Sequence, residues 1–419
     1  MPDTDTDSLV IVIDPGHGGD EEGGLCDHLV EKDMNLAVAN AMKEELEKYQ
    51  NVTVYLTRTG DQKLSLEQRS AYAKSVNADI MFCLHFNISE EHKLFGTECW
   101  VSAFGEEYSI GQSFADVFMN TMEEFGVYTR GAKTRLDENG ADYYGIIRTA
   151  SALDVPCVLI EHCYMDHEND RPFCEGRQQW ETLGQLDATA AAKYFNLRSA
   201  ILDVDYSDYA NLTVPVPDYV MRPDYTPPDV CMIDLVSQDM ANGEVTIELC
   251  GADYDSGMLY YAYSYDGGET FSDLQPWYDK SKDTIYFTMQ VPPRMLPQIV
   301  VKGYNGYDLH TTSNLLSLPS MDYQTQEELA AEWEREAGPE TDMDIPADIL
   351  SDQDTGMRDE TAKELMEVRR PADTQEQQPV SLGYFLNVCL VCALLVFGMV
   401  LSIALPLRYR KRRRRRRRK

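Results

Sequence analysis

Four polar side chains stand where predicted strands end or a predicted helix begins. His17 follows the first apolar run, within the turn sequence IDPGHGG, and Glu31 opens the first amphipathic helix. His85 ends the run IMFCLH, and Glu161 ends the run VPCVLIE. Functional groups of open α/β sheets gather beyond the carboxyl ends of the strands, so we expect these four residues to meet at one edge.

The types of these residues suit metal-assisted hydrolysis. Two imidazoles and one carboxylate form the ligand set of a catalytic zinc site that keeps one position open. A second carboxylate nearby can take a proton from water. Taken singly, a histidine such as His17 is more often structural, and Glu31 suits the N-terminus of a helix. Glu161 has the stronger single case, because a carboxylate at a buried strand end is costly without a partner.

The elements that must position these residues alternate between strands and helices. Because this alternation is typical of an α/β fold, we predict a mainly parallel sheet flanked by helices over residues 1–196. Ser65 and Gln68 form a capping box that opens one of the helices. The predicted strands are residues 9–13, 52–56, 80–85, 97–102 and 155–163, and the predicted helices are residues 32–49, 65–76, 112–125 and 178–194.

The pattern changes after residue 196. Residues 197–228 are a proline-rich connector, and residues 229–318 show short alternating strands typical of a small all-β sandwich. A hairpin over residues 259–271 is predicted to turn at Asp266-Gly267-Gly268, and this stretch resembles bacterial Ig-like modules, which implies a spacer or binding role. Residues 319–380 are acidic and predict a disordered stalk, with a short helix as an option at 327–336.

Residues 382–407 form an uncharged apolar run, which predicts one transmembrane helix. The polybasic segment 408–419 follows at once, so the positive-inside rule predicts that it lies in the cytoplasm and that residues 1–380 lie outside. No signal peptide is recognisable before residue 9, which leaves the export route open. The balance of 37 basic against 71 acidic residues argues against a nucleic-acid partner.

Six motifs carry a family resemblance over residues 9–196. IDPGHGG, EKDMNLAVA, VYLTRTGD, SLEQRSAYA, ADIMFCLHFN and VPCVLIEHCYMDHEND occur in this order. Together they resemble the zinc-dependent N-acetylmuramoyl-L-alanine amidases of bacterial cell walls. The resemblance implies that His17, Glu31 and His85 hold one Zn²⁺ and that Glu161 is the general base and acid for an activated water. It implies peptidoglycan as the partner, cleaved between N-acetylmuramic acid and L-alanine.

Other positions leave alternatives open. Arg148 is a candidate for contact with a stem-peptide carboxylate, or for a surface salt bridge, and Asn87 is a second candidate for substrate contact. His162 departs from the small residue usual after the catalytic glutamate, and strand alternation favours its pointing to the opposite face of the sheet. Residues 129–147 are an ordinary loop or a cover over the zinc.

Two rival functions remain open beside the amidase. One is a catalytically silent module that binds the wall, and the other is a zinc hydrolase of another peptide-like amide. Cys231 and Cys250 could form a disulfide if their domain lies outside the cell. The oligomeric state is not predicted.

Overall fold

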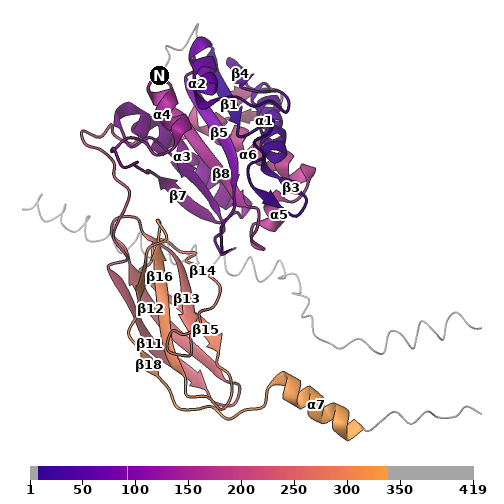
Figure 1. Cartoon of the computed structure of the whole chain (residues 1–419), viewed down its shortest axis with the longest axis vertical. Helices are drawn as coiled ribbons and strands as arrows, with labels where there is room; N and C mark the ends of the chain where they lie inside the picture. The colour runs from indigo at the N-terminus through magenta and orange to yellow at the C-terminus, as the bar shows by residue number, and fades with distance from the viewer. Residues whose placement is uncertain (1–7, 92, 338–419) are drawn as a thin grey trace, which may run out of the picture. The chain divides into compact units, whose positions relative to one another are not determined.

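The computed structural model describes residues 8–91 and 93–337 (Figure 1). Within these residues no helix is both long enough and apolar enough to cross a membrane. The predicted span 382–407, the segment 408–419 and the predicted stalk beyond residue 337 lie outside the described residues.

A six-stranded sheet forms the centre of the first domain, in the order β4-β1-β5-β8-β6-β7. Its neighbouring strands run parallel except for the antiparallel pair β6 and β8. The prediction of a mainly parallel sheet is therefore confirmed, and β7 is a strand that the sequence analysis missed. The strands are β1 (Leu9–Pro15), β4 (Val52–Leu56), β5 (Ile80–Asn87), β6 (Thr97–Trp100), β7 (Thr129–Lys133) and β8 (Cys157–Tyr164).

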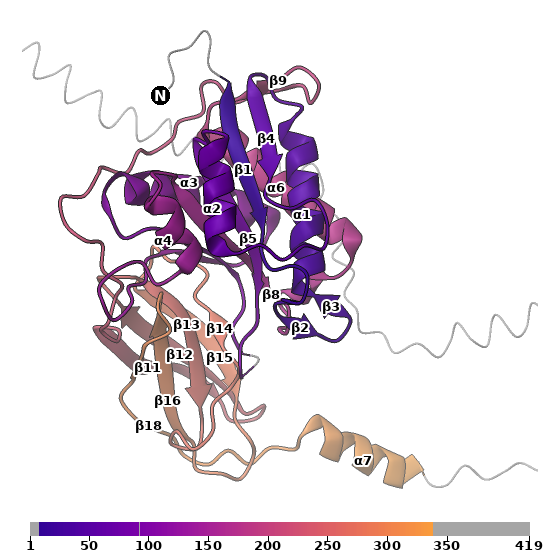
Figure 2. The same cartoon turned by 45° about the horizontal axis from the view of Figure 1, so that its top comes forward.

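Helices cover both faces of this sheet (Figure 2). The larger apolar core joins one face to α1 (Glu31–Leu46), α3 (Gly105–Phe125) and α6 (Arg177–Tyr194). The smaller core joins the other face to α2 (Leu66–Ser75) and α4 (Gly145–Ser151). The short helix α5 (Arg171–Cys174) follows β8. The capping box of Ser65 and Gln68 is confirmed.

The predicted start of α3 at Gln112 was wrong, because the helix begins seven residues earlier, at Gly105. Gly111 weakens the helical signal in the sequence. In the structure this glycine is required by packing, since a Cβ at position 111 would lie 2.9 Å from Val101.

The proline-rich connector packs along the first domain. The backbone amide of Met221 donates to the carbonyl of Ala103 at 2.9 Å, and the amide of Val214 donates to Ser113 Oγ at 2.9 Å. Two short hairpins complete this domain: β2 (Leu25–Cys26) with β3 (Leu29–Val30), and β9 (Arg198–Ser199) with β10 (Val204–Asp205).

Two sheets around the buried Trp277 form the second domain, as a sandwich. The predicted hairpin was wrong in its second arm. Its first strand ends at Ser264, and its return strand is only the two residues Gln275–Pro276. The turn is wide because the Asp266 carboxylate accepts a hydrogen bond from the amide of Thr270 at 3.0 Å. One sheet holds β11 (Val230–Asp239), β12 (Glu244–Ala252) and β15 (Thr284–Gln290); the other holds β13 (Met258–Ser264), β14 (Gln275–Pro276), β16 (Gln298–Asn305), β17 (His310–Thr312) and β18 (Leu316–Ser317).

The structure also bears on two further expectations for this region. Met321 is buried in the sandwich core, so a disordered stalk does not begin at residue 319, whereas α7 (Gln326–Ala337) confirms the short helix allowed at 327–336. Cys231 and Cys250 are free thiols. Cys231 pairs with Gly251 and not with Cys250, and this offset of one residue turns the two side chains to opposite faces of the sheet.

Candidate functional site

Three of the four predicted site residues meet at the edge of the sheet. His17 Nε2 lies 3.1 Å from Glu31 Oε2, and His85 Nδ1 lies 2.8 Å from Glu31 Oε1. One possible ligand atom from each residue lies within 4.8 Å of the others. The two imidazole rings meet edge to face. This geometry gives a two-imidazole, one-carboxylate cluster that could hold a metal ion.

Tight turns bring these ligands together. His17 has a φ of 59°, and Gly18 and Gly19, which follow it, have φ values of 126° and 63°. Such left-handed conformations favour glycine, so the glycines turn the chain after His17. At position 23, where φ is 74°, a Cβ would lie 2.4 Å from Glu31 Oε2. Gly23 therefore leaves the room that the Glu31 carboxylate occupies.

Glu31 opens α1 with its carboxylate fixed from several sides. Its Oε2 accepts a hydrogen bond from the amide of Gly24 at 2.7 Å, and its Oε1 accepts one from the amide of Phe86 at 3.2 Å. Burial raises the pKa of this carboxyl, but hydrogen bonds from His17 and His85 outweigh burial and lower the pKa below its ordinary value. An ionised carboxylate between two imidazoles is suited to a cation.

Glu161 lies beside this cluster, as predicted. It pairs with His85 across the neighbouring strands β8 and β5. Its Oε2 is buried and has no hydrogen-bond partner within the described part of the chain. Burial raises the pKa of Glu161 well above its ordinary value, and the nearby carboxylates of Glu31 and Glu98 raise it further. A raised pKa makes the ionised carboxylate a stronger base, which suits it to take a proton from water.

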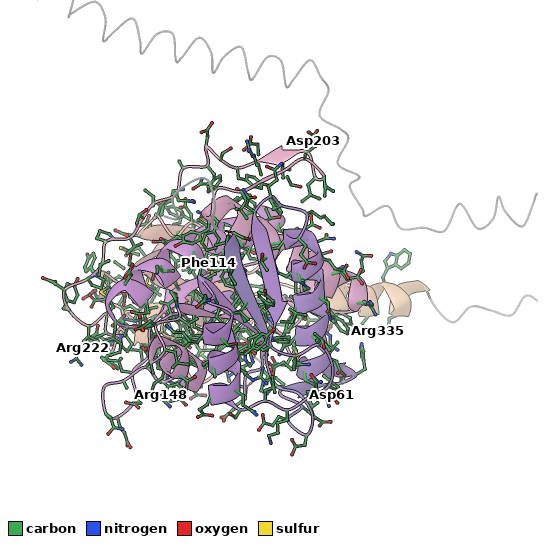
Figure 3. All side chains as sticks on the ribbon, turned by 90° about the horizontal axis from the view of Figure 1, so that it is seen from above. Asp61, Phe114, Arg148, Asp203, Arg222 and Arg335 are labelled. Carbon is green, nitrogen blue, oxygen red and sulfur yellow. The ribbon has the colours of Figure 1, made fainter. Side chains whose placement is uncertain are left out.

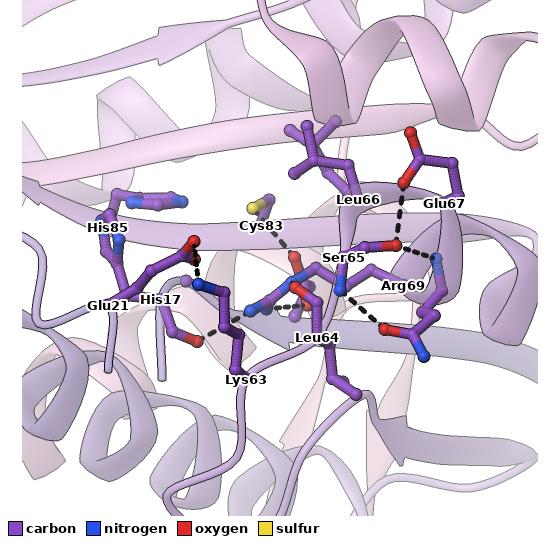
Figure 4. Close-up of a pocket in the computed structure, with 14 residues that line it drawn as sticks. His17, Glu21, Lys63, Leu64, Ser65, Leu66, Glu67, Arg69, Cys83 and His85 are labelled. Carbon is purple, nitrogen blue, oxygen red and sulfur yellow. Dashed lines mark hydrogen bonds and ion pairs between the residues drawn. The ribbon is translucent and has the colours of Figure 1, made fainter. Parts of the chain in front are cut away.

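A cavity of about 640 Å³ opens next to the cluster. His17 and His85 line one end of it, and the segment from Lys63 to Arg69 lines the other (Figure 4). Lys63 forms ion pairs with Glu21 at 2.9 Å and with Asp20 at 3.1 Å. Glu31 and Glu161 do not line this cavity, so a molecule in it meets the two imidazoles first.

Two arginines fix the turn that carries His17, and the sequence analysis assigned them no role. Arg58 donates from Nε to the carbonyl of Pro15 at 3.0 Å and from Nη2 to that of Gly16 at 2.8 Å. Arg69 donates to the carbonyl of His17 at 2.7 Å and pairs with buried Asp14 at 2.7 Å. Both arginines lie in motifs that carried the family resemblance, and that position was the sequence signal that could have indicated their role.

The two weaker candidates for substrate contact lie outside the cluster. Arg148, labelled in Figure 3, is on α4 with its side chain 47% exposed. Its Nη1 donates to the carbonyls of Asp142 and Tyr143, with the second bond at 3.2 Å. The nearest carboxylate to it, that of Asp137, is 4.0 Å away. Asn87 ends β5 and donates from Nδ2 to Glu98 Oε1 at 3.1 Å.

The structure also decides the orientation of His162 and the structure of residues 129–147. His162 points to the face opposite Glu161, as strand alternation favoured, and its Nε2 lies 2.9 Å from Asp187 on α6. Residues 129–147 contain β7 and the start of α4, so part of this segment belongs to the sheet. The segment is therefore more than the loop or cover that the sequence allowed.

Comparison with known proteins finds relatives of the first domain. The family model for N-acetylmuramoyl-L-alanine amidase matches residues 11–193. The chain is similar to the sporulation-specific N-acetylmuramoyl-L-alanine amidase of Bacillus subtilis, with 40% identity over 190 residues, covering 45% of this chain and 69% of that protein. It is 31% identical over 197 residues to the N-acetylmuramoyl-L-alanine amidase CwlM of Bacillus licheniformis, covering 45% of this chain and 69% of that protein.

Among solved structures, the chain is similar to the catalytic domain of CwlV, an N-acetylmuramoyl-L-alanine amidase from Bacillus (Paenibacillus) polymyxa var. colistinus. That similarity has a TM-score of 0.39 and 26% identity, and it covers 45% of this chain and 99% of that domain. Taken with the sequence relatives, the family model identifies the chain as a member of the N-acetylmuramoyl-L-alanine amidase family, which hydrolyses the amide between N-acetylmuramic acid and L-alanine in peptidoglycan.

Proposed function

We propose that this amidase is a zinc hydrolase in which His17, Glu31 and His85 hold one Zn²⁺ and Glu161 transfers the proton. The observation that carries the proposal is the cluster of three ligand atoms within 4.8 Å beside a buried carboxylate oxygen that has no hydrogen-bond partner among the described residues. Two imidazole nitrogens and one carboxylate are a donor set that zinc prefers, and three protein ligands leave a position for substrate or water. The residues present therefore fit the ion.

Each residue has a definite task in this proposal. When bound, zinc lowers the pKa of water and polarises the scissile carbonyl. Glu161 takes a proton from the attacking water at Oε2 and returns it to the alanine nitrogen as the amide bond breaks. Arg58 and Arg69 hold the backbone around His17, so that its imidazole keeps its direction. The cavity next to His17 and His85 is the place for the substrate.

The test is to treat purified peptidoglycan with the zinc-loaded protein and to quantify newly exposed L-alanine amines. We expect amines from the wild type, none after chelation, and none from Glu161→Gln with its zinc content unchanged. Glu181→Gln is the matched control, because Glu181 lies on the surface of α6, paired with Arg177. Binding to peptidoglycan without new amines would favour the silent module, and release of other amines would favour a different amide substrate.

We further propose that residues 382–407 anchor the chain in the cell membrane, with the catalytic domain outside and residues 408–419 in the cytoplasm. The uncharged run and the basic segment directly after it support this topology. The sandwich, which we take as an Ig-like module, and the acidic segment after it would then set the enzyme's reach into the wall.

A protease test addresses this topology. External protease added to cells with an opened wall should cut the chain before residue 382 and leave a membrane-bound fragment. Resistance of the chain in those cells, together with cleavage after detergent lysis, would contradict an outside location.

A further inference from the structure

A buried ion-pair cluster lies next to the catalytic edge and takes no part in metal binding. Glu98 in β6 pairs across the sheet with Glu161 in β8. The Glu98 carboxylate accepts hydrogen bonds from Arg130 Nε at 2.8 Å and Lys133 Nζ at 2.7 Å through Oε2, and from Asn87 through Oε1. These contacts hold a negative charge at a fixed position beside the carboxylate that transfers the proton.

The sandwich domain supplies two hydrogen-bond acceptors for the guanidinium of Arg130. Its Nη1 donates to the hydroxyl of Tyr260 at 2.8 Å, and its Nη2 donates to Asp308 Oδ2 at 2.8 Å. Arg130 is only 4% exposed. A buried cation is tolerated only when its donors are satisfied, so the second domain supplies partners that Arg130 needs.

Both sandwich residues are themselves held in place. Tyr260 is fully buried in β13 and donates its hydroxyl proton to the carbonyl of Phe95 in the first domain. Asp308 lies in the loop between β16 and β17, where Asn305 Oδ1 accepts from the amides of Tyr307 and Leu309. Asn305 thus fixes the loop that carries Asp308, and the Tyr260 hydroxyl is fixed by its bonds to Phe95 and Arg130.

Apolar contacts close the same interface. Phe95 of the first domain forms one buried cluster with Leu259, Tyr260 and Leu274 of the sandwich. Lys280 of the sandwich also donates to Thr129 Oγ1 at 2.8 Å, next to Arg130. The sandwich is therefore packed directly against the strands that carry the Glu98 cluster.

We propose that the β-sandwich positions the active site: through Tyr260 and Asp308 it fixes Arg130, and through Arg130 it fixes Glu98 beside Glu161. Tyr260, Asp308, Arg130 and Glu98 are positioning residues, because they act through one another and not on the substrate. This inference rests on the proposed role of Glu161. It assigns the second domain a task within the reaction, in addition to any role as a spacer.

The test uses the full chain with Asp308→Asn and, separately, Tyr260→Phe. On a soluble muramoyl-peptide we expect kcat to fall about tenfold, the usual scale for losing a supporting contact, with KM changed less than twofold. Hydrogen–deuterium exchange should become faster in β6 and β8 at pH 7. The matched control is Asp322→Asn, because Asp322 pairs with an arginine of the sandwich, Arg294, at 3.2 Å and is 86% exposed.

The two readouts separate this inference from the proposed function. If the wild type releases no L-alanine amines, the proposed function fails, and exchange in β6 and β8 alone decides the inference. Unchanged kcat in both variants of a cleaving enzyme overturns it. Exchange equal to that of the wild type in both variants also overturns it. A loss confined to Asp308→Asn and Tyr260→Phe, and absent from Asp322→Asn, supports it.

Discussion

Gly16 lies against the imidazole of His85, so closely that an ideal Cβ at position 16 would be 2.3 Å from His85 Cε1. The three atoms nearest to that Cβ all belong to the same ring. The turn after β1 and the end of β5 are adjacent in the sheet, and the Gly16 amide donates to the Leu84 carbonyl at 2.9 Å. The direction of His85 thus depends on the absence of a side chain at position 16.

The first prediction is that Gly16→Ala displaces the His85 ring and weakens metal binding. The backbone of Gly16 is held by hydrogen bonds to the Leu84 carbonyl and from Arg58. The added methyl group must therefore displace the His85 ring. We expect zinc affinity to fall about 10- to 100-fold, a range typical of lost support around a ligand. Competition with a coloured chelator measures it. Gly60→Ala is the control, since no heavy atom lies within 4 Å of a Cβ there. Equal affinity in both variants would contradict the prediction.

The second prediction concerns Arg69 and stability. Arg69→Met leaves Asp14 buried, at 0% exposure, without its ion-pair partner. Breaking one side of a buried pair costs about 3–5 kcal/mol, so we expect that loss in the free energy of unfolding, measured by denaturant titration. Arg177→Met removes the exposed pair with Glu181 and should cost less than about 1 kcal/mol. A similar loss of unfolding free energy in both variants would contradict a special contribution from the buried pair.

The third prediction is a pH dependence that originates at Glu98. Burial raises the pKa of this carboxyl, but Lys133 and Arg130 outweigh burial and lower the pKa from its ordinary 4.5 to about 2. The folded state therefore favours the ionised form. The resulting stability is present above pH 4.5 and is lost as the pH falls from 4.5 towards 2. A shift of this size corresponds to about 3 kcal/mol in the free energy of unfolding.

Glu98→Gln isolates this contribution. We expect the difference in unfolding free energy between wild type and Glu98→Gln to be largest near pH 7. It should shrink as the pH falls below 4.5, because the unfolded wild-type chain then takes up a proton at Glu98 while the folded state, with its lower pKa, stays ionised. Denaturant titrations at pH 7, 4 and 3 measure the difference. A difference that is constant over this range would contradict the assignment.

The sequence was sufficient to predict that the four central candidate residues meet at one edge of the sheet. His17 follows β1, and His85 and Glu161 lie in the C-terminal halves of β5 and β8; Glu31 begins the helix that returns to the same edge. In such a sheet the chain order alone brings strand ends together. The mainly parallel sheet was predictable for the same reason.

The supporting contacts were not predictable in this way. Arg58 and Arg69 bind backbone carbonyls of a turn more than 40 residues earlier, and no local pattern encodes such a contact. The link from Arg130 to Asp308 spans 178 residues and crosses between two domains. Sequence periodicity indicates burial and the type of secondary structure, whereas these contacts depend on the tertiary packing of helices, strands and domains.

The last prediction concerns removal of the metal. β1, α1 and β5 carry His17, Glu31 and His85 and pack in the large apolar core, so chelation should leave the far-UV circular dichroism unchanged. Zinc at 100 times its Kd should stabilise the folded protein by about 2.7 kcal/mol, which raises the Tm of the amidase domain by roughly 5–10 °C. His17→Ala should abolish this shift, whereas His310→Ala, in β17 of the sandwich, should retain it. If His17→Ala keeps the full shift, zinc binds elsewhere, and His17 is not a ligand.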